Sequence, residues 1–126
     1  VSDMSTIVHC ESKRVNTILK YIDENYMNRI SLEHLGNLVQ MSPSAVCRYF
    51  KSKTKINLWE YINNYRIDKV ALHMLKTDDY ISEICYACGF NNISHFNRVF
   101  KKRMGMSPGE YRAMQKDSII STSILN

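Results

Sequence analysis

Two sets of polar and basic residues recur about fifty positions apart, each at the spacing of one helical face. They are Ser44, Cys47, Arg48 and Lys51, here called the first stripe, and Ser94, Asn97, Arg98 and Lys101, the second stripe. The spacing i, i+3, i+4, i+7 places the four members of a stripe on one side of an α-helix. Arginine can bind guanine O6 and N7 together, asparagine can read adenine, and serine can bond to base edges or phosphates. Each stripe therefore predicts a helix whose outer face can read the major groove of double-stranded DNA.

Further basic residues continue each stripe toward the carboxyl end of its helix. Lys53 follows the first stripe, and Lys102 and Arg103 follow the second. Together with Lys51 and Lys101, these residues suit contacts to phosphates, which set affinity and register rather than base preference.

Two side chains in or beside the stripes leave more than one interpretation open. His95 follows Ser94, where it can contact a phosphate or a base, or be an ordinary exposed histidine. Cys47 occupies a stripe position from which it can touch a thymine methyl group or contribute little. A thiol exposed beside basic residues can also be sensitive to oxidation, but an incidental cysteine is the simpler explanation.

The charge pattern favours a polyanionic partner. The chain has 17 Lys and Arg against 12 Asp and Glu, which gives a net charge of +5. Residues 48–55 and 98–103 form two basic runs that no acidic residue interrupts. One such run would usually be a solvated surface, but two runs at equivalent places of two stripes point to a shared role.

Other classes of protein find little support in the sequence. No Ser/His/Asp arrangement, pair of catalytic carboxylates or glycine-rich phosphate loop is present, and the 126 residues include only four glycines. No apolar run approaches the roughly 18 residues of a membrane span, and nothing at the amino end resembles a signal peptide. We therefore expect a cytoplasmic protein that is not an enzyme and has no membrane partner.

The pair Cys85 and Cys88 has the Cys-x-x-Cys spacing of a metal or redox site. A structural zinc needs four ligands, usually from a second such pair, and the other cysteines and the histidines do not have that spacing. Both cysteines share a helical face with Ile84, and cysteine packs readily as a small apolar residue. The pattern indicates core packing, with no metal and no cofactor.

Hydrophobic periodicity predicts an all-α protein of about seven helices. Residues 32–53 and 81–103 match each other at an offset of 49 to 50 positions, so that one helix-turn-helix unit is present twice. The helices that carry the stripes should run over about 43–52 and 93–104. The expected organisation is a linker or frayed segment over 1–11, a first helix-turn-helix unit over 12–57, a linker helix over 58–76, a second unit over 77–116 and a tail over 117–126.

Short motifs surround both stripes. They are Ser42-Pro43-Ser44, Arg48-x-Phe50-Lys51 and Arg66-Ile67 in the first half, and Gly89-Phe90, Ser94-x-Phe96, Phe100-Lys101-Lys102, Gly105-x-Ser107-Pro108 and Tyr111-Arg112 in the second. Over about residues 13–113 the sequence with these motifs resembles the AraC/XylS family of transcription regulators. The resemblance implies a DNA-binding domain in which a long helix joins two helix-turn-helix units.

The same resemblance implies partners. In this family the third and sixth helices enter successive major grooves of double-stranded DNA, and the domain usually follows an amino-terminal part that senses a ligand or dimerises. The chain begins at Val1 rather than at Met, so a missing sensor or dimerisation domain is a candidate partner, as is RNA polymerase. The alternative is a basic interaction module that binds an acidic protein without reading DNA sequence.

The chain departs from the family pattern at two positions of the first unit. Gly36 stands where the family commonly has alanine, at a helix cost of roughly 1 kcal/mol or less. Lys55 stands where the second unit has Gly105. We therefore expect the helix of the first stripe to end differently from the helix of the second.

Overall fold

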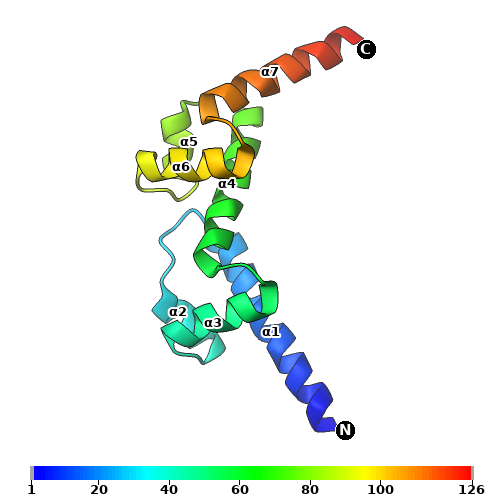
Figure 1. Ribbon diagram of the computed structural model, residues 1–126, viewed down its shortest axis with the longest axis vertical. Coiled ribbons are helices and arrows are strands. Elements are labelled where there is room, and N and C mark those ends of the chain that lie inside the picture. Colours follow the sequence, from blue (N-terminus) through cyan, green and yellow to red (C-terminus); the bar gives the residue numbers. More distant parts are fainter. Residues whose placement is uncertain (1, 126) are drawn as a thin grey trace. The chain divides into compact units, whose positions relative to one another are not determined.

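The described backbone forms seven α-helices joined by short turns (Figure 1). The computed structural model describes the backbone of residues 2–125 and the side chains of residues 13–118. No strand occurs in this part of the chain, which confirms the predicted all-α class, and none of the described helices is both long and apolar enough to cross a membrane. The helices are α1 (Ser2–Asn25), α2 (Leu32–Val39), α3 (Pro43–Thr54), α4 (Leu58–Lys76), α5 (Ile81–Ala87), α6 (Ile93–Met104) and α7 (Pro108–Leu125).

The first and last helices are longer than the sequence periodicity predicts. Helix α1 begins at Ser2, so that residues 2–11 are helical rather than a linker, and α7 continues to Leu125 instead of ending near Lys116. No proline or glycine occurs within α1 or after Gly109. Without a proline or glycine, the backbone hydrogen bonds of a helix can continue through residues that show no apolar periodicity.

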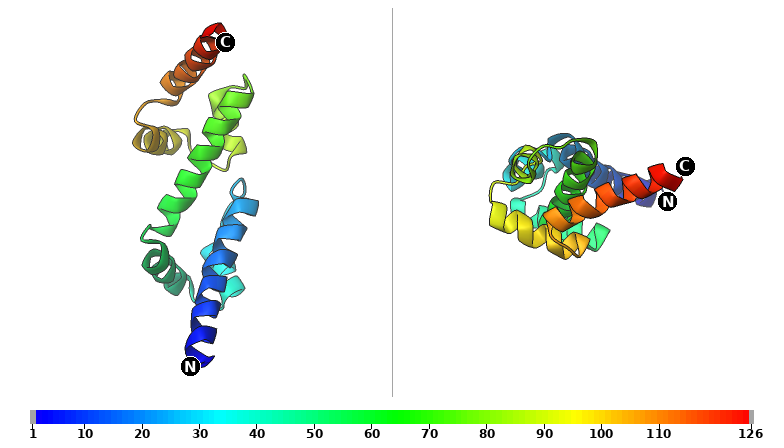
Figure 2. Two further views of the ribbon diagram at one scale, coloured as in Figure 1. Left: turned by 90° about the vertical axis from the view of Figure 1, so that its right-hand side faces the viewer. Right: turned by 90° about the horizontal axis from the view of Figure 1, so that it is seen from above.

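The chain divides into two compact units, and the boundary lies within α4. The first unit ends at Ile62 and the second begins at Asn63. Helix α4 itself runs without a break from Leu58 to Lys76 (Figure 2), as the sequence predicts for the long helix. One helix therefore contributes its beginning to the first unit and the remainder to the second.

The first unit is held together by apolar side chains from α1, α2, α3 and the beginning of α4. Helix α2 packs against both α1 and α3, and the Phe50 ring meets the Tyr61 ring edge to face, with 5.4 Å between their centres. Burial of each large apolar side chain stabilises the fold by about 1.5–3 kcal/mol. The fully or almost fully buried ones are Ile18, Ile22, Leu35, Val46, Phe50, Leu58 and Ile62.

The second unit repeats this arrangement with α4, α5 and α6, and α7 covers it. Helix α6 packs against both α5 and α7. Aromatic rings form a row in its core. The centre of the Phe96 ring lies 5.2 Å from that of Phe90 and 5.7 Å from that of Phe100, and the Phe100 and Tyr111 ring centres are 5.6 Å apart. The other buried side chains include Ile67, Val70, Met74, Ile84, Cys85 and Cys88.

The turn between the paired helices differs in length between the two units, and the backbone approaches Gly36 closely in the shorter one. In both turns a backbone N–H returns to the preceding helix, from Met41 to the Gly36 carbonyl at 2.9 Å and from Phe90 to the Cys85 carbonyl at 3.2 Å. A Cβ atom at Gly36 would overlap the Met41 carbonyl oxygen. Glycine therefore allows the close backbone approach of the shorter turn, whereas the longer one accommodates Cys85.

The two stripe-bearing helices end in the same way, contrary to the expectation from Lys55. Lys55 has φ 67° and donates its backbone N–H to the Lys51 carbonyl, just as Gly105 has φ 81° and donates to Lys101. The Thr54 hydroxyl secures the first of these ends, since it donates to the Phe50 carbonyl at 2.8 Å and accepts from the Ile56 N–H at 3.2 Å. Local hydrogen bonds thus hold a lysine in the left-handed conformation that glycine adopts without strain.

Replacement of Lys55 by glycine should stabilise the protein. Relief of the left-handed strain outweighs the added entropy of the unfolded chain, so we expect a gain of about 0.5–1 kcal/mol in the free energy of unfolding. Urea denaturation followed by circular dichroism measures it. Lys53→Gly is the matched control, because the same exchange inside α3 should destabilise by about 0.5–1 kcal/mol. A Lys55→Gly protein no more stable than wild type would contradict the strained cap.

Candidate nucleic-acid interface

Helix α3 exposes the first stripe because its opposite face is buried. The helix begins at Pro43, and the Ser42 hydroxyl caps it by accepting a hydrogen bond from the Ala45 N–H at 3.3 Å. Val46 and Phe50, four positions apart, are fully buried. This fixes the rotation of the helix about its axis. The stripe residues then lie outside, with Ser44, Arg48 and Lys51 exposed and Cys47 half-buried.

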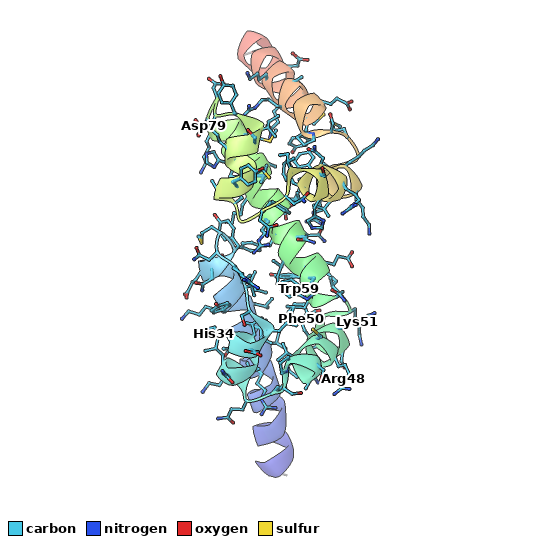
Figure 3. All side chains as sticks on the ribbon, turned by 90° about the vertical axis from the view of Figure 1, so that its left-hand side faces the viewer. His34, Arg48, Phe50, Lys51, Trp59 and Asp79 are labelled. Carbon is cyan, nitrogen blue, oxygen red and sulfur yellow. The ribbon has the colours of Figure 1, made fainter. Side chains whose placement is uncertain are left out.

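Figure 3 shows the direction of two side chains of the first stripe, Arg48 and Lys51. The Arg48 and Lys51 side chains project outwards from α3, whereas Phe50 points into the first unit. Lys53, in the last turn, is also exposed, and its Nζ lies 6.0 Å from the centre of the Tyr49 ring. The outer face of α3 therefore carries the cationic side chains of Arg48 and Lys51, Lys53 adds a third in the last turn, and the helix itself contains no acidic residue.

Helix α6 exposes the second stripe by the same means. Asn92 caps the helix, since its Oδ1 accepts a hydrogen bond from the His95 N–H at 2.8 Å. Phe96 and Phe100, again four positions apart, are fully buried. His95 is half-buried, and its Nδ1 lies 3.2 Å from Nη2 of Arg98. The exposed residues are Ser94, Asn97, Arg98, Lys101 and Lys102.

Arg103, in the last turn of α6, has a carboxylate partner in α4. Its Nε and Nη2 donate to the two carboxylate oxygens of Asp68 in α4, at 3.2 and 2.9 Å. This hydrogen-bonded pair raises the pKa of Arg103 above its ordinary value. Both side chains are about half exposed, so the bridge stabilises by no more than about 1 kcal/mol. Arg103 thus braces α6 against α4, and its charge is less available to a phosphate than the sequence suggests.

Three contributors to this surface are missing from the sequence prediction. The cap Asn92 could have been found, because it aligns with Ser42 at the same offset of 50 as the stripes. The contact between His95 and Arg98 could also have been found, since residues i and i+3 are neighbours on a helix. The pairing of Asp68 with Arg103 carries no such signal, because 35 positions separate the two residues.

The Cys-x-x-Cys pair lies in the core of the second unit, as predicted. Cys85 and Cys88 are both buried. Burial, together with the neighbouring Cys88, raises the pKa of Cys85 to about 11. Burial also raises the pKa of Cys88. Among the described side chains no three His, Cys, Asp or Glu residues come together as a metal-binding group.

Comparison with known proteins identifies the class of this domain. A family model described as a helix-turn-helix domain matches residues 35–114. A solved transcriptional regulator with an AraC-type DNA-binding domain, from Chromobacterium violaceum, has the same fold. The two structures match with a TM-score of 0.74 and a sequence identity of 21%, and the match covers 82% of this chain and 93% of the C. violaceum chain. The chain belongs to the AraC/XylS family of helix-turn-helix transcription regulators.

Particular relatives are found in Bacillus subtilis. The chain is 34% identical over 104 residues to the uncharacterized HTH-type transcriptional regulator YdeC, a match that covers 82% of this chain and 36% of YdeC. It is 33% identical over 106 residues to the bifunctional transcriptional activator/DNA repair enzyme AdaA, covering 84% of this chain and 50% of AdaA. The chain thus spans about a third to a half of the length of these relatives.

Chemical modification tests whether Cys85 and Cys88 lie in the core. Replacement of Cys10 by serine leaves three thiols, those of Cys47, Cys85 and Cys88. In this Cys10→Ser protein, N-ethylmaleimide at pH 7.5 should modify the native state at Cys47 alone. Only the thiolate reacts, and a pKa of about 11 leaves on the order of one Cys85 thiol in 3,000 ionised at that pH. Mass spectrometry of tryptic peptides measures the modification, and urea-unfolded protein is the control in which all three thiols should react. Rapid modification of Cys85 or Cys88 in the native state would show that the pair is not core.

Proposed function

We propose that this chain is the DNA-binding part of a transcription regulator, and that α3 and α6 enter successive major grooves of an asymmetric duplex site. The observation that carries the proposal is the repetition of one exposed stripe on two helices whose opposite faces are buried. A major groove admits a helix, and a second helix packed across it holds it in place. Family membership supports the same conclusion.

The proposed base contacts come from the middle of each stripe. Arg48 and Arg98 are exposed and long enough to reach guanine O6 and N7. Asn97 is exposed beside Arg98 and suits adenine, while Ser44 and Ser94 lie in the first turns of their helices, where base edges and phosphates are both within reach. Cys47 offers a half-buried, weakly polar surface that suits a thymine methyl group.

The proposed phosphate contacts lie toward the carboxyl end of each recognition helix. Lys51 and Lys53 in α3, and Lys101 and Lys102 in α6, are exposed. Each lysine is a flexible point charge that can neutralise a phosphate without reading the base beside it. These four lysines therefore supply affinity and register, and the remaining residues of the two stripes supply sequence preference.

The regulator as a whole is proposed to include more than this chain. The relatives YdeC and AdaA are about two to three times as long as the part that the chain matches. A sensor or dimerisation domain and RNA polymerase are the partners that a transcription regulator of this family would use. Binding to an acidic protein through the basic surfaces alone is not favoured, because the family model is that of a helix-turn-helix domain and the relative YdeC is an HTH-type transcriptional regulator.

Selection of bound duplexes from a random pool at physiological salt tests the function. We expect a single asymmetric motif that extends over about two helical turns, since two recognition helices one turn apart would read about 34 Å of duplex. Footprinting on the selected site should show protection in two successive major grooves. Enrichment of no motif would reject sequence-specific binding and support electrostatic docking, and protection of one groove would reject the use of both helices.

Replacement of Arg48 or Arg98 should weaken the base preference of the protein in only one half of the selected DNA site. Arg48→Ala and Arg98→Ala should each weaken binding to the selected site by about 1–3 kcal/mol, because a bidentate contact to guanine is lost. Fluorescence anisotropy with duplexes altered at single base pairs measures the loss. The two variants should lose preference at different base pairs. If both lost it at the same base pairs, the assignment of one helix to each half would be wrong.

Removal of a phosphate-contacting lysine should change the salt dependence without changing the motif. For Lys51→Ala, Lys101→Ala or Lys102→Ala, the slope of log affinity against log salt should become shallower by about 1, because one fewer counterion is released. Lys20→Ala is the control, since Lys20 is also exposed but lies on α1, outside both recognition helices. A slope that is unchanged in the three variants would remove these lysines from the interface.

A further inference from the structure

A contact within α6 links a stripe arginine to the histidine beside the stripe. Nη2 of Arg98 lies 3.2 Å from Nδ1 of His95, one helical turn earlier. A guanidinium group has donors and no acceptor, so Nδ1 must accept the hydrogen bond and the ring proton must be on Nε2. The contact therefore fixes the tautomer of His95 and restrains the free end of Arg98.

His95 is itself held in place, which makes it an effective support. Its backbone N–H is bonded to the capping Asn92 at 2.8 Å. Its ring lies 6.2 Å from the ring of Phe90, which is buried in the core of the second unit. The side chain is half-buried, whereas Arg98 is exposed. A restrained imidazole thus stands between the core and a flexible arginine.

We infer that His95 is a positioning residue that orients Arg98 for base reading. The inference rests on the proposed function, because it concerns how the second stripe reads DNA. A guanidinium has five N–H donors, so one bond to His95 leaves enough for a bidentate contact with guanine. An arginine held before binding loses less rotamer freedom on binding, which raises affinity for the correct base.

The first stripe has no such support. Ala45 occupies the position equivalent to His95, at the offset of 50 that aligns Arg48 with Arg98, and an alanine side chain has no hydrogen-bond acceptor. Arg48 therefore reads DNA without a restraint of this kind. The second recognition helix should consequently discriminate more sharply at its arginine-read base pair than the first.

A pair of variants of nearly equal shape tests whether the acceptor matters. In His95→Asn, the side-chain oxygen can lie near the position of Nδ1 and accept a hydrogen bond from Arg98, whereas His95→Leu is similar in size and has no acceptor. Affinity is measured by fluorescence anisotropy for the selected duplex, for duplexes altered at single base pairs, and for a scrambled duplex. Thermal unfolding of each variant verifies that the fold is intact.

We expect His95→Leu to bind the selected duplex roughly 2- to 12-fold more weakly than His95→Asn, the factor that one ordinary hydrogen bond supplies. The loss should be confined to the base pair at which Arg98→Ala loses preference. Base preference in the other half of the site should not change. Equal affinity and equal preference of the two variants would overturn the inference.

A double-mutant cycle separates positioning from direct contact. If His95 acts through Arg98, His95→Leu should have no further effect in an Arg98→Ala protein. If the histidine instead contacts DNA itself, its removal should weaken binding by the same factor in both backgrounds, and the inference is wrong. A wild-type protein without any base preference would contradict the proposed function, whereas a base-selective wild type that His95→Leu leaves unchanged would contradict this inference alone.

Discussion

The burial of two apolar side chains four positions apart determines the surface of each recognition helix. In α3 these are Val46 and Phe50, and in α6 they are Phe96 and Phe100. A rotation of either helix by one residue would expose part of this apolar surface, at about 1.5–3 kcal/mol for each large side chain, and would turn a charged stripe residue toward the core. Since both penalties oppose rotation, the stripes can lie only on the outside. The proposed DNA-binding surface is in this sense a consequence of core packing.

The two units share this packing of the recognition helix but differ in their turns, helix ends and polar contacts. The first unit has a shorter turn in which the backbone approaches Gly36 closely, and its recognition helix ends in a strained lysine that a threonine hydroxyl secures. The second has a longer turn and an unstrained glycine end, together with the bridge from Arg103 to Asp68 and the contact from Arg98 to His95. These two contacts restrain the second recognition helix and its arginine. Units that differ in this way suit a binding site whose two halves differ in sequence.

Sequence patterns predicted most of the fold and of the exposed stripe residues. The bounds of α4 and α6 agree with the expectation, and the cysteine pair is buried as its position beside Ile84 indicated. The extents of α1 and α7 were underestimated, because a helix without an apolar stripe gives no periodic signal although nothing in its sequence ends it. The end of α3 was misjudged as well, since the strain at Lys55 is offset by Thr54 hydrogen bonds that a comparison with Gly105 does not reveal.

The amino-acid sequence by itself determined the helical class, the repeat, and which face of each recognition helix carries charge. These follow from the spacing of apolar and basic residues within one or two helical turns, where the distance along the chain sets the distance in space. The tertiary structure decided that Arg103 pairs with Asp68, and that a Cβ at position 36 would meet the Met41 carbonyl. Such contacts depend on how helices and turns approach one another, and the periodicity of a single helix does not encode that approach.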